Sequence, residues 1–176
     1  MAHDFRTESA HYLRDVYVPR LETALRTLPA EDLWWRPHDD CISFGNVLLH
    51  LEGNVRQWIL CGLGGQRDLR DRDSEFGAVS GPDGAALLTE LTRTVQTAAR
   101  VIESFDPRAL PRRLSIQGHE VTAQEAIYHV VEHFSWHTGQ AVWIAKARAG
   151  AGHGLGFYDD EVLQRATGTP EEPGTP

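Results

Sequence analysis

Apolar residues recur about every three to five positions along four segments of the chain, a spacing that indicates amphipathic helices. The four segments cover about residues 5–28, 44–61, 83–105 and 123–149. Pro19 lies inside the first segment and predicts a bend or a break there. Four helices of this length predict an all-α fold, a four-helix bundle.

The segments that join the predicted helices differ in character. Residues 62–82 form a long crossover rich in glycine and charged side chains, and they are interpreted as a loop. Residues 110–121 alternate weakly between apolar and polar, which predicts a small β-hairpin before the last helix. Ser43 predicts the N-cap of the second helix, and Thr122 with Glu125 predicts a capping box at the start of the fourth.

A chain of 176 residues has the length of one domain and can bury a core without disulfides or a structural metal. One short helix is expected at about residues 159–165, and the end of the chain, rich in Thr, Pro, Gly and Glu, is expected to be disordered. The predicted organisation is therefore one four-helix bundle over residues 1–166 and a disordered tail over residues 167–176.

Charge and composition exclude several classes of partner. The formal net charge is −8 and no run of Lys and Arg overrides it, which argues against nucleic acid. No apolar stretch approaches the roughly 20 residues of a membrane span, and the start of the chain lacks a signal-peptide pattern. No membrane contact and a cytoplasmic location are expected. Cys41 and Cys61 are interpreted as free, buried thiols, with Cys61 projecting near the His50 edge of its helix.

Three histidines at four-residue spacing in the last predicted helix carry the strongest chemical signal: His129, His133 and His137. Side chains four residues apart lie one above the other on a helix, so two such imidazoles can hold one ion at about 2.0–2.1 Å. Projection at about 100° per residue turns His133 and His137 toward the core and His129 partly outward. We therefore assign His133 and His137 to a metal site and His129 to its rim.

A third ligand is needed, because two histidines alone make a weak site. His50 lies mid-helix in the second segment at a similar edge position and is the natural donor, with His11 in reserve. The alternative is a set of hydrogen-bonded core histidines without a metal. Unpaired buried imidazoles are costly, and three would crowd one another, which favours the metal. Gln140 or Glu132 could orient a ligand ring through its second nitrogen.

Three pieces of the sequence match a known superfamily: His50-Leu-Glu-Gly-Asn54 with Asn46 upstream, the hairpin followed by Val121-Thr122, and His129-x3-His133-x3-His137-x-Gly139-Gln140. With them the chain resembles the DinB-like (damage-inducible) metal-binding four-helix superfamily over about residues 5–149. Thr138 stands where many members have arginine. The resemblance implies one divalent ion, often zinc or nickel, on the triad His50, His133 and His137. It also implies a homodimer.

The resemblance further implies a class of reaction, because the superfamily includes transferases and isomerases that use bacillithiol, mycothiol or glutathione. A cation on three histidines with an open position deprotonates a thiol, and the thiolate can attack an electrophile. The first hypothesis is therefore a metal-dependent thiol S-transferase with a small-molecule substrate. Trp58, Trp136 or Trp143 could line its pocket, and Arg56 could bind a cofactor carboxylate. No residue is assigned as a catalytic acid or base.

Two other functions stay open. A metal-dependent hydrolase would use the ion to activate water and would need a carboxylate near it. Glu52 and Glu132 project away from the histidines on their helices, and the sequence has no HExxH motif. The third hypothesis is a non-catalytic metal-binding or ligand-binding stress protein, and the sequence does not decide whether the protein is an enzyme.

Overall fold

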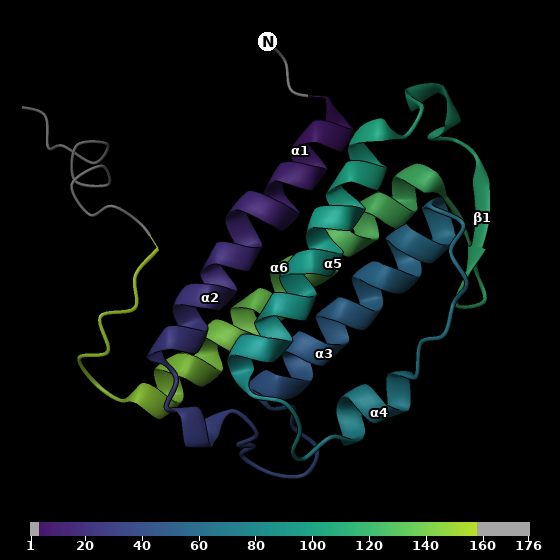
Figure 1. Cartoon of the computed structure of the whole chain (residues 1–176). Coiled ribbons are helices and arrows are strands. Elements are labelled where there is room, and N and C mark those ends of the chain that lie inside the picture. The colour runs from purple at the N-terminus through teal and green to yellow at the C-terminus, as the bar shows by residue number, and fades with distance from the viewer. Residues whose placement is uncertain (1–3, 158–176) are drawn as a thin grey trace, which may run out of the picture.

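Four long helical rods lie side by side in the structure, a computed structural model that describes residues 4–157 (Figure 1). This is the all-α four-helix bundle expected from the apolar pattern, so the predicted fold class is confirmed. The expected short helix at 159–165 and the expected tail at 167–176 lie outside the described residues. The rods are formed by α1 (Phe5–His11), η1 (Tyr12–Tyr17) and α2 (Val18–Thr27); by α3 (Phe44–Val55) and η3 (Arg56–Leu63); by α5 (Gly84–Ser104); and by α6 (Ala123–Ala149).

Polar side chains begin two of these helices where the sequence predicted their caps. The Ser43 hydroxyl accepts from the amide of Asn46, and the Asn46 side chain accepts from the amide of Ser43, so α3 begins with a capping box. Thr122 and Glu125 form the same reciprocal pair at the start of α6. Such caps satisfy amides that have no partner inside the helix, so both helix starts follow from local sequence.

The first rod continues through Pro19 without a break. The π-helical stretch η1 lies directly before α2, and the amide of Val18 bonds to the carbonyl of Leu13, five residues back. Pro19 then falls in the first turn of α2. The hydrogen bonds change there from the i−5 pattern to the i−4 pattern, and at such a change one backbone carbonyl has no N–H partner. Proline, which has no N–H, therefore costs little stability at this position. The predicted break is therefore wrong.

The long crossover between η3 and α5 contains a helix that the sequence did not predict. α4 (Arg72–Gly77) begins at Asp71, whose side chain accepts from the amide of Ser74, and it packs against α3. Glu75 of α4 is buried, although most of its neighbours in the crossover are exposed. The interpretation of residues 62–82 as a loop is wrong at this point, because the bonds that tie α4 to α3 come from Asn46, which lies 29 positions before Glu75.

A short hairpin precedes α6, as predicted. β1 (Arg113–Ile116) and β2 (His119–Thr122) pair antiparallel. Gln117 and Gly118 have φ of 52° and 78°, the left-handed conformation that a two-residue hairpin turn requires. The remaining short elements are two 3-10 turns, η2 (Ala30–Asp32) and η4 (Pro107–Ala109).

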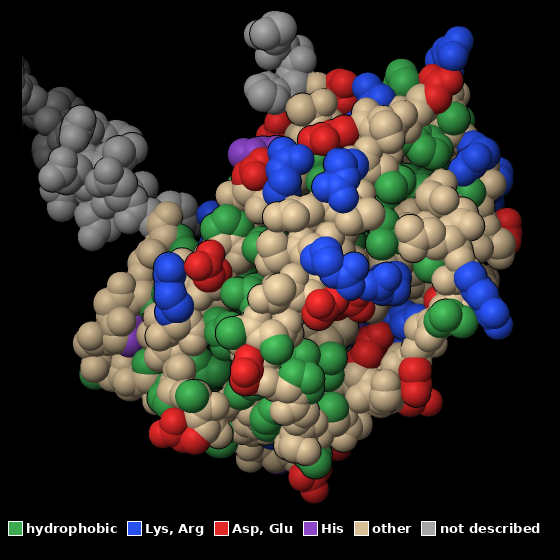
Figure 2. Space-filling model, viewed as in Figure 1, with side chains coloured by type: hydrophobic (Ala, Val, Ile, Leu, Met, Phe, Trp, Pro, Cys, Tyr) green, Lys and Arg blue, Asp and Glu red, His purple; other side chains and the backbone are tan. Residues whose placement is uncertain are grey.

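The core lies between the rods and is filled by large apolar side chains. Phe44 and Phe134 are fully buried, and Tyr17 stacks on Phe134 with ring centroids 5.8 Å apart. Burial of each such side chain stabilises the fold by roughly 1.5–3 kcal/mol. Acidic and basic side chains are interspersed on the face shown in Figure 2. Within residues 4–157, no helix is both long and apolar enough to cross a membrane.

Candidate metal centre

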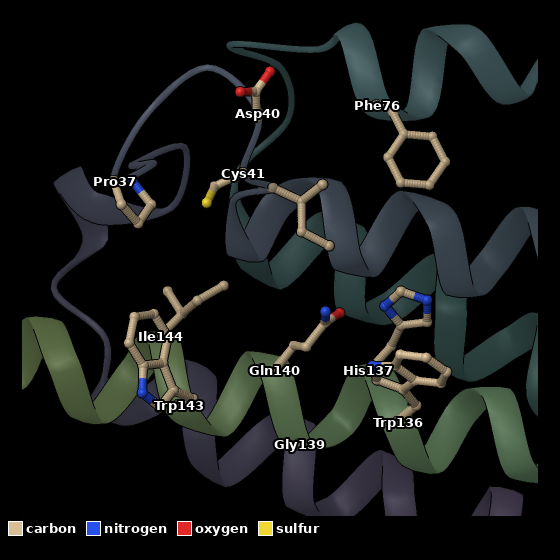
Figure 3. A pocket seen from close by; sticks show the side chains of 11 residues that line it. Pro37, Asp40, Cys41, Phe76, Trp136, His137, Gly139, Gln140, Trp143 and Ile144 are labelled. Atoms are coloured by element: carbon tan, nitrogen blue, oxygen red, sulfur yellow. The ribbon is translucent and has the colours of Figure 1, made fainter.

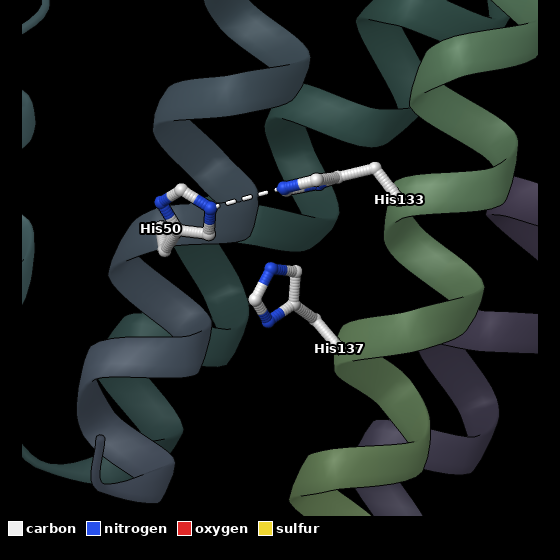
Figure 4. A group of neighbouring side chains, drawn as sticks. All are labelled: His50, His133 and His137. Carbon is white, nitrogen blue, oxygen red and sulfur yellow. Dashed lines mark hydrogen bonds between the residues drawn. The ribbon is translucent and has the colours of Figure 1, made fainter. Parts of the chain in front are cut away.

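Three imidazole rings meet between α3 and α6. His50 on α3 and His133 and His137 on α6 turn toward one another (Figure 4). Each offers one ring nitrogen, and these three nitrogens lie within 4.8 Å of one another. The ring centroids are 4.4 to 4.9 Å apart. The structure therefore brings together the residues that the spacing predicted, although 83 positions separate His50 from His133.

A carboxylate holds the ring of His50 from the side away from the cluster. Nδ1 of His50 lies 2.9 Å from Oε2 of Glu75. Because a carboxylate only accepts, Nδ1 carries the proton and Nε2 keeps its lone pair. Nη2 of Arg70 lies 3.1 Å from the same Nδ1, and both nitrogens donate to the same carboxylate. Glu75 thus fixes the tautomer of His50 that a metal ligand needs.

Glu75 belongs to a buried ion pair. Nε and Nη2 of Arg70 donate to its two carboxylate oxygens at 2.7 and 2.8 Å. The two side chains are only 3% and 9% exposed. Burial alone would raise the pKa of Glu75, but the hydrogen bonds from Arg70 and His50 outweigh it and hold the pKa below its usual value. The carboxylate is therefore charged, and Arg70 balances that charge.

Residues of α3 position Glu75 beneath His50. Nδ2 of Asn46 donates to the carbonyls of Glu75 and Ala78, each at 2.8 Å, so the residue that caps α3 also ties α4 to it. Gly53 leaves the space that the carboxylate occupies, because a Cβ there would lie 2.0 Å from Oε1 of Glu75. Asn46 and Gly53 both belong to the motif around His50, and the structure gives them the task of holding α4.

The separation of His50 and His133 suits one shared ion. Two nitrogens bound to one zinc ion at about 2.0–2.1 Å lie about 2.9–3.4 Å apart for bond angles of about 90–110°. The Nε2 atoms of His50 and His133 are 3.1 Å apart, a distance at which the two rings also form the hydrogen bond drawn in Figure 4. Nδ1 of His133 and Nδ1 of His137 are buried without a hydrogen-bond partner in the described part of the chain. The spacing of the facing nitrogens, and not these unpaired Nδ1 atoms, is what fits a ligand cluster, because an ion on Nε2 of His133 would leave its Nδ1 unpaired as well.

The two histidines of α6 stay neutral in the fold. Burial, with the neighbouring imidazoles as the next cause, lowers the pKa of His133 to about 3. Burial, followed by the effect of His50, lowers the pKa of His137 to about 4. Protons therefore do not compete for these rings at neutral pH, which leaves their lone pairs free for a cation.

Acid is expected to destabilise the metal-free protein below about pH 6.5. A histidine in an unfolded chain titrates near 6.5, whereas His133 and His137 keep pKa values of about 3 and about 4 in the fold. Between these values the unfolded chain binds protons that the folded chain does not. The free energy of unfolding therefore falls as the pH is lowered, by at most about 1.4 kcal/mol per pH unit for each ring and by less because both are partly exposed.

Urea unfolding of the chelator-treated protein at several values between pH 7 and pH 5 measures this dependence. A His133→Asn variant should show a shallower slope, because one of the two rings has been removed. Identical slopes in the two proteins would contradict the burial of these rings as neutral groups.

The other candidate histidines lie outside the cluster. His129 is half-buried, with its ring centroid 4.1 Å from that of Trp58 and 5.4 Å from that of His133, which agrees with a rim position. His11 is exposed on the first rod, where Nδ1 lies 3.1 Å from a carboxylate oxygen of Asp15. The reserve ligand is therefore not brought to the cluster.

The carboxylate that orients a ring comes from an unexpected place. Glu132 is exposed on α6. Glu75 orients His50 instead, together with Arg70, and the sequence predicted a role for neither of them. The local signal for α4 was Asp71 as an N-cap. The contact between Glu75 and His50, 25 positions apart, cannot be read from helical spacing.

A family model covers nearly all of this architecture. Residues 3–153 match the model described as a protein of unknown function, DUF1572. The chain belongs to the DUF1572 family. The matched range contains all four rods and all three histidines of the cluster, so the DUF1572 bundle and the cluster coincide. No curated protein matches the sequence.

The DUF1572 bundle has a DinB-like fold. The DUF1572 bundle is similar to the crystal structure of a DinB-like protein from Bacillus subtilis, with a TM-score of 0.60 and 13% sequence identity. The similarity covers 84% of this chain and 94% of that chain. At this identity the likeness shows the fold alone, and for the fold it confirms the resemblance found in the histidine motifs.

Proposed function

We propose that this DUF1572 protein holds one divalent metal ion on His50, His133 and His137. The observation that carries the proposal is the approach of three ring nitrogens to within 4.8 Å, with His50 fixed in the ligand tautomer by Glu75. Imidazole ligands suit zinc and nickel, which are the ions we propose. The DinB-like fold, in which metal ions are frequent, adds support.

We infer further that the site serves thiol chemistry. Three protein ligands leave one coordination position open, and a bound divalent ion supplies the positive charge that deprotonates a thiol at neutral pH. The rings of His133 and His137 are neutral, no imidazole adds negative charge, and Arg70 balances the charge of Glu75 behind the cluster. The proposed reaction is the transfer of a low-molecular-weight thiol to a small-molecule electrophile by a metal-dependent S-transferase.

Hydrolysis is the less supported alternative, because Glu75 beside the cluster and Glu52 on α3 are both engaged. Glu75 is held by Arg70. Glu52 accepts hydrogen bonds from Arg56 and from the hydroxyl of Thr94 on α5. Activation of water would need a carboxylate free to take a proton, and neither of these two is free. The hydrogen bond to Glu52 also engages Arg56, the residue named from the sequence as a candidate for binding a cofactor carboxylate.

An S-transferase should show an activity that depends on both thiol and metal. The zinc- or nickel-loaded protein, given 1-chloro-2,4-dinitrobenzene and bacillithiol, mycothiol or glutathione, is expected to form the S-conjugate at least ~10-fold faster than the uncatalysed background with one of the three thiols. Absorbance of the conjugate measures the rate, and chelation should abolish the enhancement. Activity that survives chelation would remove the ion from the proposed reaction, and no activity with any thiol would favour the non-catalytic metal-binding or ligand-binding protein.

The homodimer and the identity of the thiol both stay predictions. The homodimer comes from the resemblance alone. The proposed S-transferase needs no residue from a second copy, because His50, His133 and His137 all belong to one chain.

A further inference from the structure

A cavity of about 650 Å³ opens beside His137, between α6, α4 and the loop before α3 (Figure 3). Trp143 and Ile144 lie at one end of it, and His137 and Phe76 lie at the other. Gln140 projects into the middle. The cavity therefore extends from the histidine cluster along one side of α6.

The size and the lining of the cavity fit a small molecule. Ligand pockets measure about 300–1,000 Å³ and are mostly apolar with a few polar groups. Aromatic and aliphatic side chains dominate this wall, and Asp40, Cys41, His137 and Gln140 are its ionisable or amide side chains. Oε1 of Gln140 is buried and makes no hydrogen bond of good geometry in residues 4–157, although it lies near enough to the His137 ring to oppose the lowering of that ring's pKa by burial. It can therefore accept a hydrogen bond from a ligand.

The charge of the lining selects against anions. Among the lining residues, all of them described, Asp40 carries the only full charge, and none is Lys or Arg. A carboxylate or phosphate would lose hydration here without gaining a counter-charge. Bacillithiol, mycothiol and glutathione are strongly polar, and two of them carry carboxylates, so the cavity suits the electrophile better than the thiol.

We propose that this cavity binds an uncharged, ring-containing, largely apolar molecule whose reactive end lies toward His137 and whose hydrogen-bond donor reaches Gln140. The indoles of Trp136 and Trp143 supply aromatic surface for its ring. Its role as the electrophile rests on the proposed function. Its binding does not, because side chains of the bundle form the cavity without a metal.

A second copy of the chain is the competing occupant, since Trp136 and Trp143 are 66% and 60% exposed. Tyr128 on the same helix is 63% exposed and does not line the cavity. An exposed aromatic side chain on α6 is therefore not by itself a sign of a binding site or of an interface with a second copy. What distinguishes the two tryptophans is that they border a concave, apolar space next to His137.

Two fluorescent probes test the chemical class. N-phenyl-1-naphthylamine and 1-anilinonaphthalene-8-sulfonate share their rings and one N–H donor, and they differ by a sulfonate. Titration of each into the protein is expected to give a Kd at least ~10-fold lower for the uncharged probe. Equal Kd values would overturn the proposal. So would binding that weakens as the protein concentration rises, because a second copy would then cover the face.

A bulky substitution in the lining tests whether the probe binds in this cavity. Gly139 lies on the lining, and a Cβ there would meet no atom within 4 Å. Gly139→Leu should therefore obstruct the cavity without a clash and with better helix propensity. We expect ~10-fold weaker binding of the uncharged probe and an unchanged thermal unfolding temperature or a higher one. Ser135→Leu adds similar bulk to α6 outside the cavity, and an equal effect of both variants would overturn the proposal.

The rates at which the two cysteines are alkylated give an independent measure of whether the probe occupies the cavity. Cys41 lines the cavity and Cys61 does not, and both are free and half-buried. The uncharged probe should slow alkylation of Cys41 by iodoacetamide in a Cys61→Ser protein and leave Cys61 unaffected in a Cys41→Ser protein. Protection of both cysteines or of neither would overturn the proposal. If the probe protects Cys41 in a protein that takes up no zinc or nickel, the proposed function fails and the cavity assignment stands.

Discussion

Replacement of His50 by alanine is expected to lower the affinity for zinc by at least ~100-fold, because changes to the residues behind a metal ligand already cost about 10–100-fold. His50 is the only ring of the cluster that comes from α3. Its loss leaves His133 and His137, two imidazoles of one helix, which hold an ion weakly. Calorimetric titration of the chelator-treated protein with zinc measures the affinity.

Metal analysis of purified proteins supplies the controls for this first prediction. His137→Ala should lose metal as His50→Ala does. His119→Ala is the matched control, because His119 lies on β2 and is not part of the cluster. Equal zinc content in the wild type and in both cluster variants would remove the site. The S-transferase hypothesis would then lose the ion on which it depends.

Replacement of Glu75 by alanine is expected to lower the free energy of unfolding by ~3–5 kcal/mol, the usual cost of breaking a buried ion pair. The change leaves the guanidinium of Arg70, which is only 3% exposed, without its carboxylate. It also removes the acceptor for Nδ1 of His50. A desolvated charge without a counter-charge costs more than the intact pair contributes. Urea unfolding of the metal-free protein measures the loss.

A surface pair and a double variant make this second prediction specific. Glu90 pairs with Arg93 on α5, where the side chains are 58% and 65% exposed. Glu90→Ala should therefore change stability by less than ~1 kcal/mol. An Arg70→Met/Glu75→Leu protein should recover most of the loss, because both charges are gone. A loss below ~1 kcal/mol in Glu75→Ala itself would show that the buried pair does not hold α4.

The bundle and the histidine cluster were predictable from the sequence because their signals are local. Ser43 and Thr122 place two helix starts through bonds that span three residues. The spacing of His133 and His137 places both rings on one side of α6 by helix geometry alone. His50 could be chosen because its edge position on a neighbouring helix required only that the two helices pack face to face.

The π-helical stretches limited what helical projection could predict. At about 100° per residue, Cys61 falls near the His50 edge of its helix. η3 begins at Arg56 and has more residues per turn than an α-helix. Each of its residues therefore turns by less than about 100°, and side chains from Arg56 onward point in other directions than the projection gives. Cys61 is half-buried, and its Sγ lies 3.4 Å from the carbonyl oxygen of Arg67 in the crossover. Cys41 is half-buried too, so the expectation of buried thiols is wrong for both cysteines.

The carboxylate behind His50 was unpredictable for a different reason. α4 is only six residues long, and a helix of that length has little stability of its own. Bonds from Asn46 and the ion pair with Arg70 hold it, and both depend on how the crossover returns to α3. No periodic pattern within the crossover predicts how it returns to α3. Tertiary contacts therefore determine that α4 is helical, which the local sequence does not.

The distance along the chain between the ligands has a consequence for folding kinetics. His50 and His133 are 83 positions apart, and the second lies on the last helix of the bundle. The cluster is complete only after α6 has docked on α3, so an ion held there cannot nucleate folding. Such an ion binds the native state in preference to earlier states and slows unfolding rather than speeding refolding. Metal loss would therefore shorten the lifetime of the folded chain even under conditions where the bundle remains the stable state.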